Sequence, residues 1–344
     1  MGVDLSDVLL KRKISLDDLC GKSLAVDAYN TLYQFLAIIR QPDGTPLMDR
    51  TRRVTSHLSG ILYRTANLGE KGIRIVYVFD GEPPELKEME IRRRRKIREE
   101  AALKYEDALR AGRVEDARKY AQATATLKEL MVEDSKRLLE GLGVPWVQAP
   151  SEGEAQAAHM AARGDVWAAA SQDHDSLLFG APRMVKNLTI SGRRKLPGRQ
   201  AFVEVEPEVV DLHEVLADLG LTREQLIDVG ILIGTDYNPD GVRGVGPKTA
   251  LKLVKQFGDL SGVVAQTPDM DLPDNVNRIK EFFLQPKVRS DYMLSWREPN
   301  IEDVVGFLCG ERDFSEDRVR KALERMKTGA ARPATKPTLE RYFG

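Results

Sequence analysis

Short apolar segments that alternate with helical patterns constrain the fold of this chain more than any other feature. The segments cover Lys22–Val26, Ile73–Phe79, Val144–Gln148 and Val166–Ala170. Ile73–Phe79, with the letters IRIVYVF, is the most strand-like of them, because β-branched and aromatic residues favour strands. Val166–Ala170 has the length and flanks of a strand buried in a parallel sheet. The sequence therefore predicts an α/β fold in which helices flank a central, mostly parallel sheet.

Acidic residues stand beside these segments, in most cases where a strand gives way to a helix. They are Asp27, Asp80, Glu152, Glu154, Asp173, Asp175 and Asp236. The carboxyl ends of parallel strands form a common crevice, and carboxylates that converge there repel one another unless cations lie between them. Hard oxygen ligands suit Mg²⁺ or Mn²⁺, so the pattern predicts a metal cluster.

Each acid taken alone has a simpler explanation as part of a helix cap. Ser151 can act as an N-cap, with Glu152 and Glu154 complementing the helix dipole. Asp173 or Asp175 can cap the next short helix. Independent caps are not expected at five corresponding places in one chain. The set instead fits two divalent ions about 4 Å apart, one generating hydroxide from water and the other stabilising the leaving oxygen of a phosphodiester.

The totals are those of an ordinary globular protein. The chain has 344 residues, of which 42% are hydrophobic and 31% charged, and this length allows one large core and an insertion. Cys20 and Cys309 form no CxxC pattern, so the sequence indicates neither a zinc site nor a disulfide framework. No apolar run approaches the ~20 residues of a membrane span, and the N-terminus lacks the apolar part of a signal peptide. We expect a soluble, intracellular chain without a membrane partner.

Charge is distributed unevenly along the chain. The formal net charge of −1, taken on its own, argues against a nucleic-acid partner. However, Arg92–Arg98, with the letters RRRRKIR, holds six basic residues in seven positions. The window Lys87–Glu100 has too few apolar residues for a helix that faces a core. It fits either a solvated charged helix or a projecting arch that is ordered by contact with phosphates, and the helical pattern breaks near Gly112.

The remaining segments add further helices, strands and a linker. We expect helices at Tyr29–Ile39, Arg52–Leu68, Leu127–Leu142, Asp211–Leu219 and through the polar stretch Asp259–Met326, strands within Met184–Val205, and a flexible linker at Thr328–Lys336. The stretch Asp259–Met326 carries no obvious chemistry.

A glycine-rich turn leads into a helix at residues 241–248. Gly241, Gly244 and Gly246 precede Pro247 and Lys248. Glycines let backbone N–H groups approach a phosphate closely, and the dipole at a helix N-terminus favours an anion. Plain turns also have this composition, and the segment does not contain a Walker A motif.

Five segments resemble the signature blocks of one known family. They read VDAYNTLYQF, VYVFDGEPPELK, QAPSEGEAQAA, SQDHDSLLFG and LIGTDYNPDGVRGVGPKTAL. These blocks are similar to those of the flap endonucleases, which are structure-specific 5′ nucleases, and most of all to the archaeal branch. The resemblance implies an enzyme that uses two Mg²⁺ ions, which Mn²⁺ can replace, to remove 5′ flaps from branched DNA. It also implies 5′ to 3′ exonuclease action and a place in lagging-strand maturation and DNA repair.

The resemblance implies roles for individual residues. The family's seven metal-site carboxylates correspond to the seven acids named above. Lys87 and Arg94 match a cationic pair that holds the scissile phosphate and stabilises charge in the transition state. Arg92, Arg93 and Arg95 lie beside this pair, where they either contact DNA or remain solvated surface cations.

Three further parts of the chain match DNA-contacting parts of the family. Tyr33 matches an aromatic that stacks on a base near the cleavage point, although packing within its own helix explains it equally well. Gly2 matches a processed amino terminus near the active site. Residues 234–257, which include Gly241, Gly244, Gly246 and Lys248, resemble a helix–two-turn–helix element that grips duplex DNA and can bind K⁺ through backbone carbonyls.

The last residues, KPTLERYF, resemble a sliding-clamp-binding peptide. Leu339 supplies the aliphatic anchor, and Tyr342 and Phe343 supply the paired aromatics. Lys336 replaces the usual Gln, but the aliphatic and aromatic anchors normally dominate such peptides.

The resemblance divides the chain into four parts. These are an N-terminal nuclease part at 1–81, a helical arch at 82–130, an internal nuclease part at 131–327, and the linker with the clamp peptide at 328–344. We expect a monomer in the cytoplasm or nucleoid. Three alternatives are a related 5′ nuclease that prefers bubbles or duplex ends, a non-catalytic clamp-tethered scaffold and a metal-dependent phosphatase. The retained acids disfavour the scaffold, and the arch and duplex-gripping segment disfavour a small substrate.

Overall fold

The computed structural model describes residues 2–330, except for 42, 125, 191, 196–201, 268–269, 271 and 273–274. The predicted clamp-binding residues Lys336, Leu339, Tyr342 and Phe343 lie outside the described residues, as does most of the predicted linker. Among the described helices, none combines the length and the hydropathy that a membrane span requires.

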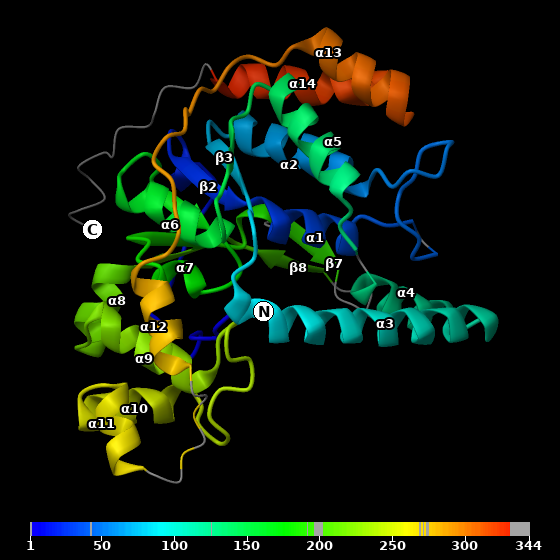
Figure 1. Ribbon diagram of the computed structural model, residues 1–344. Coiled ribbons are helices and arrows are strands. Elements are labelled where there is room, and N and C mark those ends of the chain that lie inside the picture. The colour runs from blue at the N-terminus through cyan, green and yellow to red at the C-terminus, as the bar shows by residue number, and fades with distance from the viewer. Residues whose placement is uncertain are drawn as a thin grey trace.

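A seven-stranded sheet forms the centre of the molecule, in the order β1-β9-β6-β5-β2-β3-β4 (Figure 1). The strands are β1 Arg12–Lys13, β2 Ser23–Asp27, β3 Arg74–Phe79, β4 Trp146–Gln148, β5 Ala168–Ala170, β6 Arg183–Lys186 and β9 Glu208–Asp211. The five strands from β6 to β4 pair in parallel, and β9 pairs antiparallel with β6 and β1. The prediction of a mostly parallel sheet is confirmed. A separate two-stranded sheet joins β7 Gly192–Lys195 and β8 Phe202–Val205.

Helices cover both faces of this sheet because alternate residues of each central strand point to opposite sides. Leu24 and Val26 of β2 belong to the core on one face, whereas Ala25 belongs to the core on the other. The first core is completed by α1 Ala28–Ile38, α2 Ser56–Glu70, α5 Glu129–Gly141, α13 Ile301–Val305 and α14 Glu316–Ala330. The second is completed by α6 Gly153–Ala162, α7 Asp175–Leu178, α8 Leu212–Leu219, α9 Arg223–Ile233, α10 Pro247–Phe257, α11 Leu260–Gln266 and α12 Val276–Leu284.

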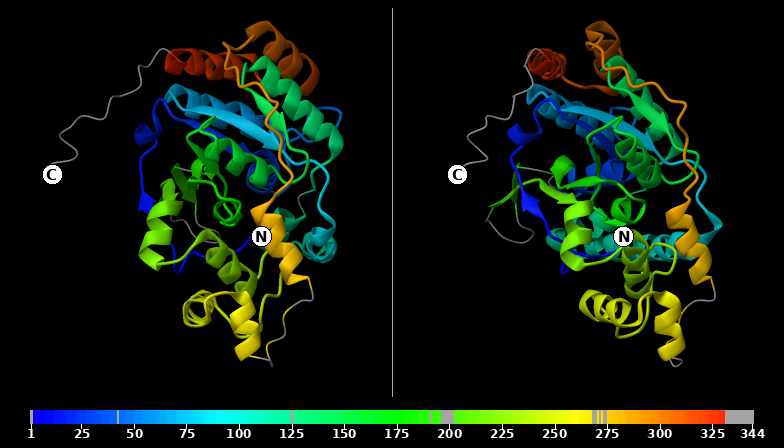
Figure 2. Two further views of the ribbon diagram at one scale, coloured as in Figure 1. Left: turned by 60° about the vertical axis from the view of Figure 1, so that its left-hand side comes forward. Right: turned by 90° about the vertical axis from the view of Figure 1, so that its left-hand side faces the viewer.

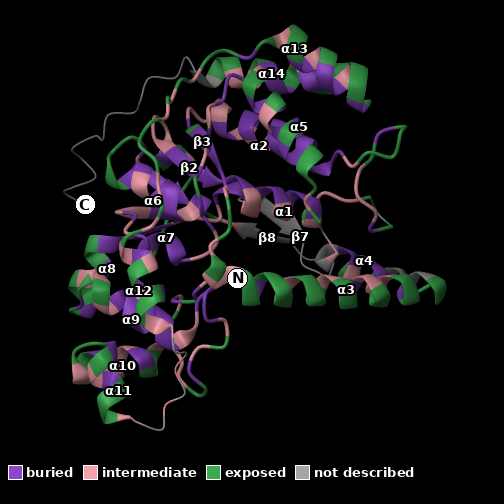
Figure 3. Ribbon diagram, in the orientation of Figure 1, coloured by how far each residue is buried: buried purple, intermediate pink, exposed green. Residues whose placement is uncertain are grey.

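Two helices extend away from this body, and we call them the arch helices. They are α3 Glu88–Arg110, which follows the short turn η2 Glu85–Lys87, and α4 Val114–Ala123. Gly112 separates them with a positive φ of 67°, a conformation that glycine adopts without steric cost. The outer surface of α3 is largely exposed (Figure 3). The prediction that this charged segment does not face a core is therefore confirmed.

The opposite ends of the molecule are formed by different helices. In the views of Figure 2, α10 and α11 lie at one end, and α13 and α14 lie at the other. An extended stretch from residue 286 to 300 connects α12 to α13. Helices were predicted throughout Asp259–Met326, and this stretch shows that the prediction was wrong there. Arg297 N–H donates to the carbonyl of Gly143 at 2.9 Å, and Asn300 N–H donates to that of Gly141 at 2.8 Å, so distant turns satisfy its backbone.

Two other boundaries differ from expectation. The helix predicted from Arg52 begins at Ser56, because Arg52 has a positive φ of 63° and Val54 forms a bridge with Met48. The strand β9 precedes the helix predicted at Asp211–Leu219. Asp211 itself is the N-cap of α8, where its side chain accepts hydrogen bonds from the first-turn amides.

Candidate active site

The ends of neighbouring parallel strands bring the predicted acids together. Asp27 is the last residue of β2 and pairs with Val78 of β3, two positions before Asp80. Asp173 and Asp175 follow β5, the neighbour of β2 on its other side. Asp80 in turn accepts a hydrogen bond from the Gly153 amide at 2.7 Å, which places the start of α6 beside the end of β3.

Helix capping explains only one of these acids. The Asp27 side chain accepts a hydrogen bond from the Asn30 amide and so caps α1. Glu152 is the N-cap residue of α6, but its side chain makes no capping hydrogen bond. Asp175 is already inside α7, and its carboxylate accepts from the Val3 amide at 2.8 Å instead. Capping therefore does not account for the set.

Burial and, after it, mutual repulsion raise the pKa values of several of these carboxylates. Burial, and then neighbouring Asp80, raise the pKa of Asp27 well above its usual value. Burial and then neighbouring Glu152 raise the pKa of Asp80 to about 6. A raised pKa means that the protein disfavours the ionised form. This part of the site therefore favours a nearby positive charge.

The other acids extend the same group. Burial and then Asp175 raise the pKa of Glu154 well above its usual value. Burial and then Asp236 raise the pKa of Asp175 to about 7. Asp173 contributes to the raised pKa of Asp27, Glu154 and Asp175. All seven predicted acids thus belong to one electrostatic group.

Two cations from the arch side complete this group. Lys87 Nζ donates to Glu152 Oε2 at 2.6 Å and lies 3.3 Å from Asp236 Oδ2. Arg94 Nη2 donates to both Asp236 carboxylate oxygens, at 2.8 and 2.7 Å. Burial opposes ionisation of Asp236, but Lys87 and Arg94 outweigh burial and lower its pKa. The structure therefore brings the two predicted catalytic cations into contact with the acids.

The donor set fits divalent metal ions in its chemistry. The side chains are not arranged around a metal ion in this conformation: in the described part of the chain, no group of three or more His, Cys, Asp or Glu side chains could hold a metal ion as it stands. Several of the carboxylates instead have protein partners, since Lys87 binds Glu152, Arg94 binds Asp236, and Ser171 donates to Glu154. Oxygen donors alone, several of them buried with raised pKa, suit Mg²⁺ or Mn²⁺ rather than softer metals.

Comparisons with known proteins agree with this geometry. Residues 1–101 match the XPG N-terminal domain, and residues 143–236 match the XPG I-region. The first segment contains Asp27, Asp80 and both cations, and the second contains the other five acids. "Flap endonuclease 1" of Hyperthermus butylicus is 58% identical over 330 residues, which is 95% of this chain and 94% of that protein. "Flap endonuclease 1" of Pyrococcus furiosus is 55% identical over 343 residues, which is 100% of this chain and 99% of that protein.

This chain belongs to the flap endonuclease family. The solved flap endonuclease-1 of Methanococcus jannaschii has a TM-score of 0.75 and 43% identity, covering 96% of this chain and 99% of that one. The catalytic core of Rad2 in complex with DNA substrate has a TM-score of 0.72 at 24% identity, covering 95% of this chain and 100% of that one, and it supports the fold alone. The resemblance seen in the sequence is confirmed at the level of family and fold.

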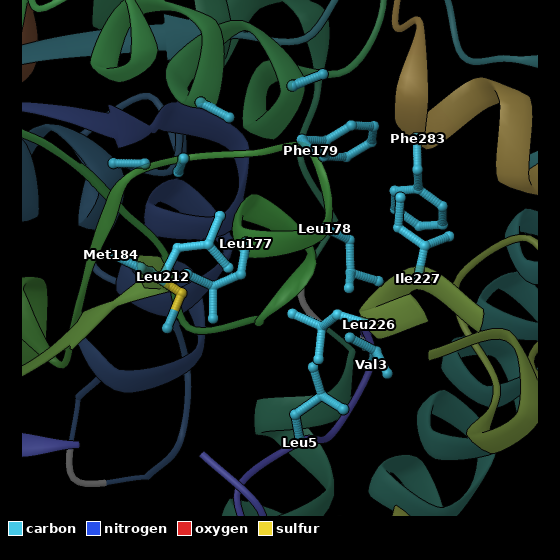
Figure 4. Close-up of a cluster of buried hydrophobic side chains, with 14 of the residues drawn as sticks. Val3, Leu5, Leu177, Leu178, Phe179, Met184, Leu212, Leu226, Ile227 and Phe283 are labelled. Carbon is cyan, nitrogen blue, oxygen red and sulfur yellow. The ribbon is translucent and has the colours of Figure 1, made fainter. Parts of the chain in front are cut away.

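The N-terminal segment of this family member enters the acid group. A Cβ atom on Gly2 would lie 2.6 Å from Asp175 Oδ2, which is too close for any other residue without a shift. The His174 ring nitrogen Nδ1 lies 3.1 Å from the carbonyl oxygen of Val3. Val3 and Leu5 are buried in the same cluster as Leu226 (Figure 4). Gly2 therefore lies beside the predicted metal ligands, whereas the contact between His174 and Val3 was not predicted.

Other predicted DNA-contacting residues lie outside the acid group. Arg92 pairs with Glu88 at 2.5 Å and Arg95 with Glu99 at 2.9 Å, each on the exposed surface of α3. Arg93 lies 3.4 Å from Asp240, in the loop that precedes the glycine-rich turn. Tyr33 is half-buried on α1.

The glycine-rich turn has the predicted form. Gly241 and Gly244 have positive φ angles of 53° and 81°, and a side chain on Gly241 would collide with the Ile233 carbonyl. Gly246 is the N-cap of α10, Pro247 is its first residue, and Lys248 is exposed. The turn begins five residues after Asp236, so one short segment links the acid group to the N-terminus of α10.

Sequence reasoning missed one buried partner of a predicted catalytic cation, at the base of α3. Glu90 is buried, with 7% of its surface exposed, and accepts from Arg94 Nε at 2.7 Å. It therefore orients the guanidinium that binds Asp236. The signal in the sequence was the i, i+4 spacing of Glu90 and Arg94, which is typical of helical ion pairs.

Proposed function

We propose that this chain is a structure-specific nuclease that hydrolyses phosphodiester bonds at 5′ flaps of branched DNA. It also acts as a 5′ to 3′ exonuclease, and it works in lagging-strand maturation and DNA repair in the cytoplasm or nucleoid. The observation that carries this proposal is the convergence of seven acids from five places in the chain with Lys87 and Arg94, in a chain that matches flap endonucleases along its whole length.

Divalent metal is part of this proposal. Nucleases of the family depend on divalent metal ions, and the physiological ion proposed here is Mg²⁺. The residues that would hold two ions are Asp27, Asp80, Glu152, Glu154, Asp173, Asp175 and Asp236. When bound, such ions lower the pKa of water and stabilise the leaving oxygen.

The residues of the chain have separate tasks around the phosphate. Seven carboxylates carry more negative charge than two divalent ions can balance, so Lys87 and Arg94 offset the repulsion of an incoming phosphate. Lys87 contacts Glu152 and Asp236, and Arg94 contacts Asp236, so both cations already lie beside the acids that the phosphate would approach. Their donors then face the oxygens on which charge develops in the transition state.

Substrate selection is assigned to the surfaces beside the acid group. The arch helices, with Arg92, Arg93 and Arg95, would contact the flap, and Tyr33 would stack on a base near the cleavage point. The segment 234–257 would hold the downstream duplex through its turn amides, with K⁺ bound by backbone carbonyls. The four-part division of the chain into 1–81, 82–130, 131–327 and 328–344 follows these tasks.

The C-terminal peptide is proposed to bind a sliding clamp. Leu339, Tyr342 and Phe343 would insert into an apolar pocket of the clamp, and the nuclease would bind as a monomer. A peptide that carries Tyr342→Ala and Phe343→Ala should lose clamp binding in calorimetry.

A cleavage assay tests the proposal. Flap, nicked, bubble and single-stranded DNA of one sequence would be incubated with Mg²⁺, and flap DNA should be cut fastest, at the branch. Asp175→Ala should abolish turnover but retain flap binding in an electrophoretic shift. Preferential cutting of bubbles would favour a related 5′ nuclease instead. Near-normal cleavage by Asp175→Ala would remove the metal assignment.

A further inference from the structure

A series of side-chain hydrogen bonds along one face of α1 reaches the acid group. Thr189 Oγ1 donates to Gln34 Oε1 at 2.8 Å. Gln34 Nε2 donates to Asn30 Oδ1 at 2.9 Å, and Asn30 Nδ2 donates to Asp173 Oδ2 at 3.4 Å. Thr189 lies in the short turn η3 Leu188–Ile190, 16 positions after Asp173 in the chain. These hydrogen bonds therefore connect η3, through one face of α1, to a proposed metal ligand.

Asp173, at the end of this series of hydrogen bonds, determines which group donates in each of them. An ionised carboxylate can only accept hydrogen bonds. Asn30 must therefore present its NH₂ group to Asp173, which leaves its amide oxygen to accept from Gln34. The oxygen of Gln34 must then accept from the Thr189 hydroxyl. All three groups donate toward Asp173, and each bond polarises the next.

Asn30 also contacts a second acid of the group. Its backbone N–H donates to Asp27 Oδ1 at 3.0 Å, while its side chain reaches Asp173. Asp27 and Asp173 come from the ends of the adjacent strands β2 and β5. Asn30 thus spans two of the acids and fixes their separation.

A small cavity lies beside these hydrogen bonds. It is lined by Asp27, Asn30, Gln34, Ser171 and Thr189, among other residues. Thr189 is 7% exposed, and its hydroxyl donates to Gln34. A substitution that removes this hydroxyl and keeps the shape of the side chain therefore tests the link through Gln34 and Asn30.

We propose that Asn30, Gln34 and Thr189 are positioning residues that hold Asp173 in the orientation needed to bind a divalent ion. This inference rests on the proposed function, because it takes Asp173 as a metal ligand. Hydrogen-bond partners of metal ligands typically change metal affinity by about 10–100-fold when they are removed. In this proposal the three residues act on metal binding through Asp173.

The direct test is Mn²⁺ binding to the full-length protein without DNA, with electron paramagnetic resonance used to measure the free and bound Mn²⁺. Asn30→Ala keeps the backbone contact to Asp27 and removes the side-chain hydrogen bond to Asp173, so Mn²⁺ should bind about tenfold more weakly or worse. Thr189→Val has the same shape but no hydroxyl. It should weaken Mn²⁺ binding about threefold, which corresponds to roughly half of the free energy that a neutral hydrogen bond contributes. Thr189→Ser keeps the hydroxyl and should match the wild type.

A fourth variant tests the direction of these hydrogen bonds. Gln34→Glu has the same shape, but its ionised side chain cannot donate, so Asn30 must turn its NH₂ group toward the new carboxylate and its oxygen toward Asp173. The added negative charge alone would strengthen Mn²⁺ binding, so weaker binding than in the wild type would identify the lost hydrogen bond to Asp173. In single-turnover cleavage, saturating Mn²⁺ should restore the rates of Asn30→Ala and Gln34→Glu. The substitutions should change only the Mn²⁺ concentration that gives half of the maximal rate.

Controls separate this inference from the proposed function. Asn67→Ala removes another side-chain amide, one that binds Arg325 on α14, and should leave Mn²⁺ binding unchanged. If Asn30→Ala, Gln34→Glu and Thr189→Val all bind Mn²⁺ as the wild type does, the positioning role is wrong. A wild type that binds Mn²⁺ but cuts no flap would contradict the proposed function, while the Mn²⁺ comparison between variants would still decide the positioning role.

Discussion

Arg94 binds Asp236 through a single guanidinium nitrogen, Nη2, which donates to both carboxylate oxygens at 2.8 and 2.7 Å. Arg94 lies on α3 and Asp236 follows α9, so this contact joins the base of the arch helix to the body of the protein. Apolar burial contributes little along α3 itself, because Met89 and Ile97 are 68% and 52% exposed. This ion pair, together with the packing of Leu86 against the core, therefore holds this end of the arch.

Glu90→Gln should slow cleavage by releasing Arg94. The variant keeps the size of the side chain but loses the ion pair with Arg94 Nε, so the guanidinium is less well oriented for the phosphate. We expect the single-turnover rate on flap DNA to fall about tenfold, or 1.4 kcal/mol in the barrier. Glu88→Gln, which breaks only an exposed pair with Arg92, should leave the rate unchanged.

A double-mutant cycle shows whether Glu90 acts through Arg94. If it does, Glu90→Gln should have no further effect in a protein that already carries Arg94→Ala. Additive losses would contradict the orientation role of Glu90.

Gly2→Ala should impair activity without unfolding the protein. The added methyl would lie 2.6 Å from Asp175 Oδ2, so either the N-terminal segment or the carboxylate must move. We expect the cleavage rate to fall at least tenfold while the melting temperature changes little, because the segment beyond Gly2 keeps its buried Val3 and Leu5. Gly69→Ala, whose methyl would meet Met326 at an ordinary 3.5 Å, is the control and should retain full activity.

The strands and the acids could be predicted from the sequence because both depend on local pattern. Apolar runs such as Ile73–Phe79 form strands, and parallel strands place their carboxyl ends at one edge, so the meeting of Asp27 and Asp80 follows from topology alone. The contacts of Asn30 could not be predicted in the same way. Its spacing to Gln34 is visible on one helix, but Thr189 and Asp173 are distant in sequence, and only packing brings them to α1.

The prediction of helices at residues 286–300 was wrong for a related reason. Its polar composition predicted helices, yet its backbone is satisfied by Gly141 and Gly143, and Trp296 Nε1 donates to the Ile75 carbonyl at 2.7 Å. Such extended backbone takes its hydrogen bonds from other elements. Local propensity therefore carries no information about it.

Removal of Lys280 should destabilise the α9–α12 region. Lys280 Nζ donates to Asp228 Oδ2 at 2.8 Å, and Asp228 is fully buried, where it also accepts from the Leu260 amide. Lys280→Met leaves this carboxylate buried without its cation, which costs about 3–5 kcal/mol. Urea unfolding would measure the loss. The double variant Lys280→Met with Asp228→Asn should recover part of it, and an equal loss in both would contradict the charge explanation.

His57 should make the stability of the protein depend on pH below neutrality. Burial, and then the charge of Arg312, lower its pKa to about 3, and neither ring nitrogen has a hydrogen-bond partner among the described residues. The unfolded chain binds a proton at His57 below its ordinary pKa of about 6.5, whereas the folded protein stays neutral there until about pH 3. Stability is therefore complete above pH 6.5 and decreases as the pH falls. The loss between pH 7.5 and 5.5 is about 1.4 kcal/mol.

His57→Leu tests this assignment, because leucine fills a similar volume and cannot bind a proton. The difference in unfolding free energy between pH 7.5 and 5.5 should be smaller in this variant by about 1.4 kcal/mol. The control is His213→Leu at an exposed position of α8, and it should retain the pH dependence of the wild type. If the His57→Leu protein keeps the full pH dependence of the wild type, a group other than His57 causes it, because this variant has no imidazole at position 57.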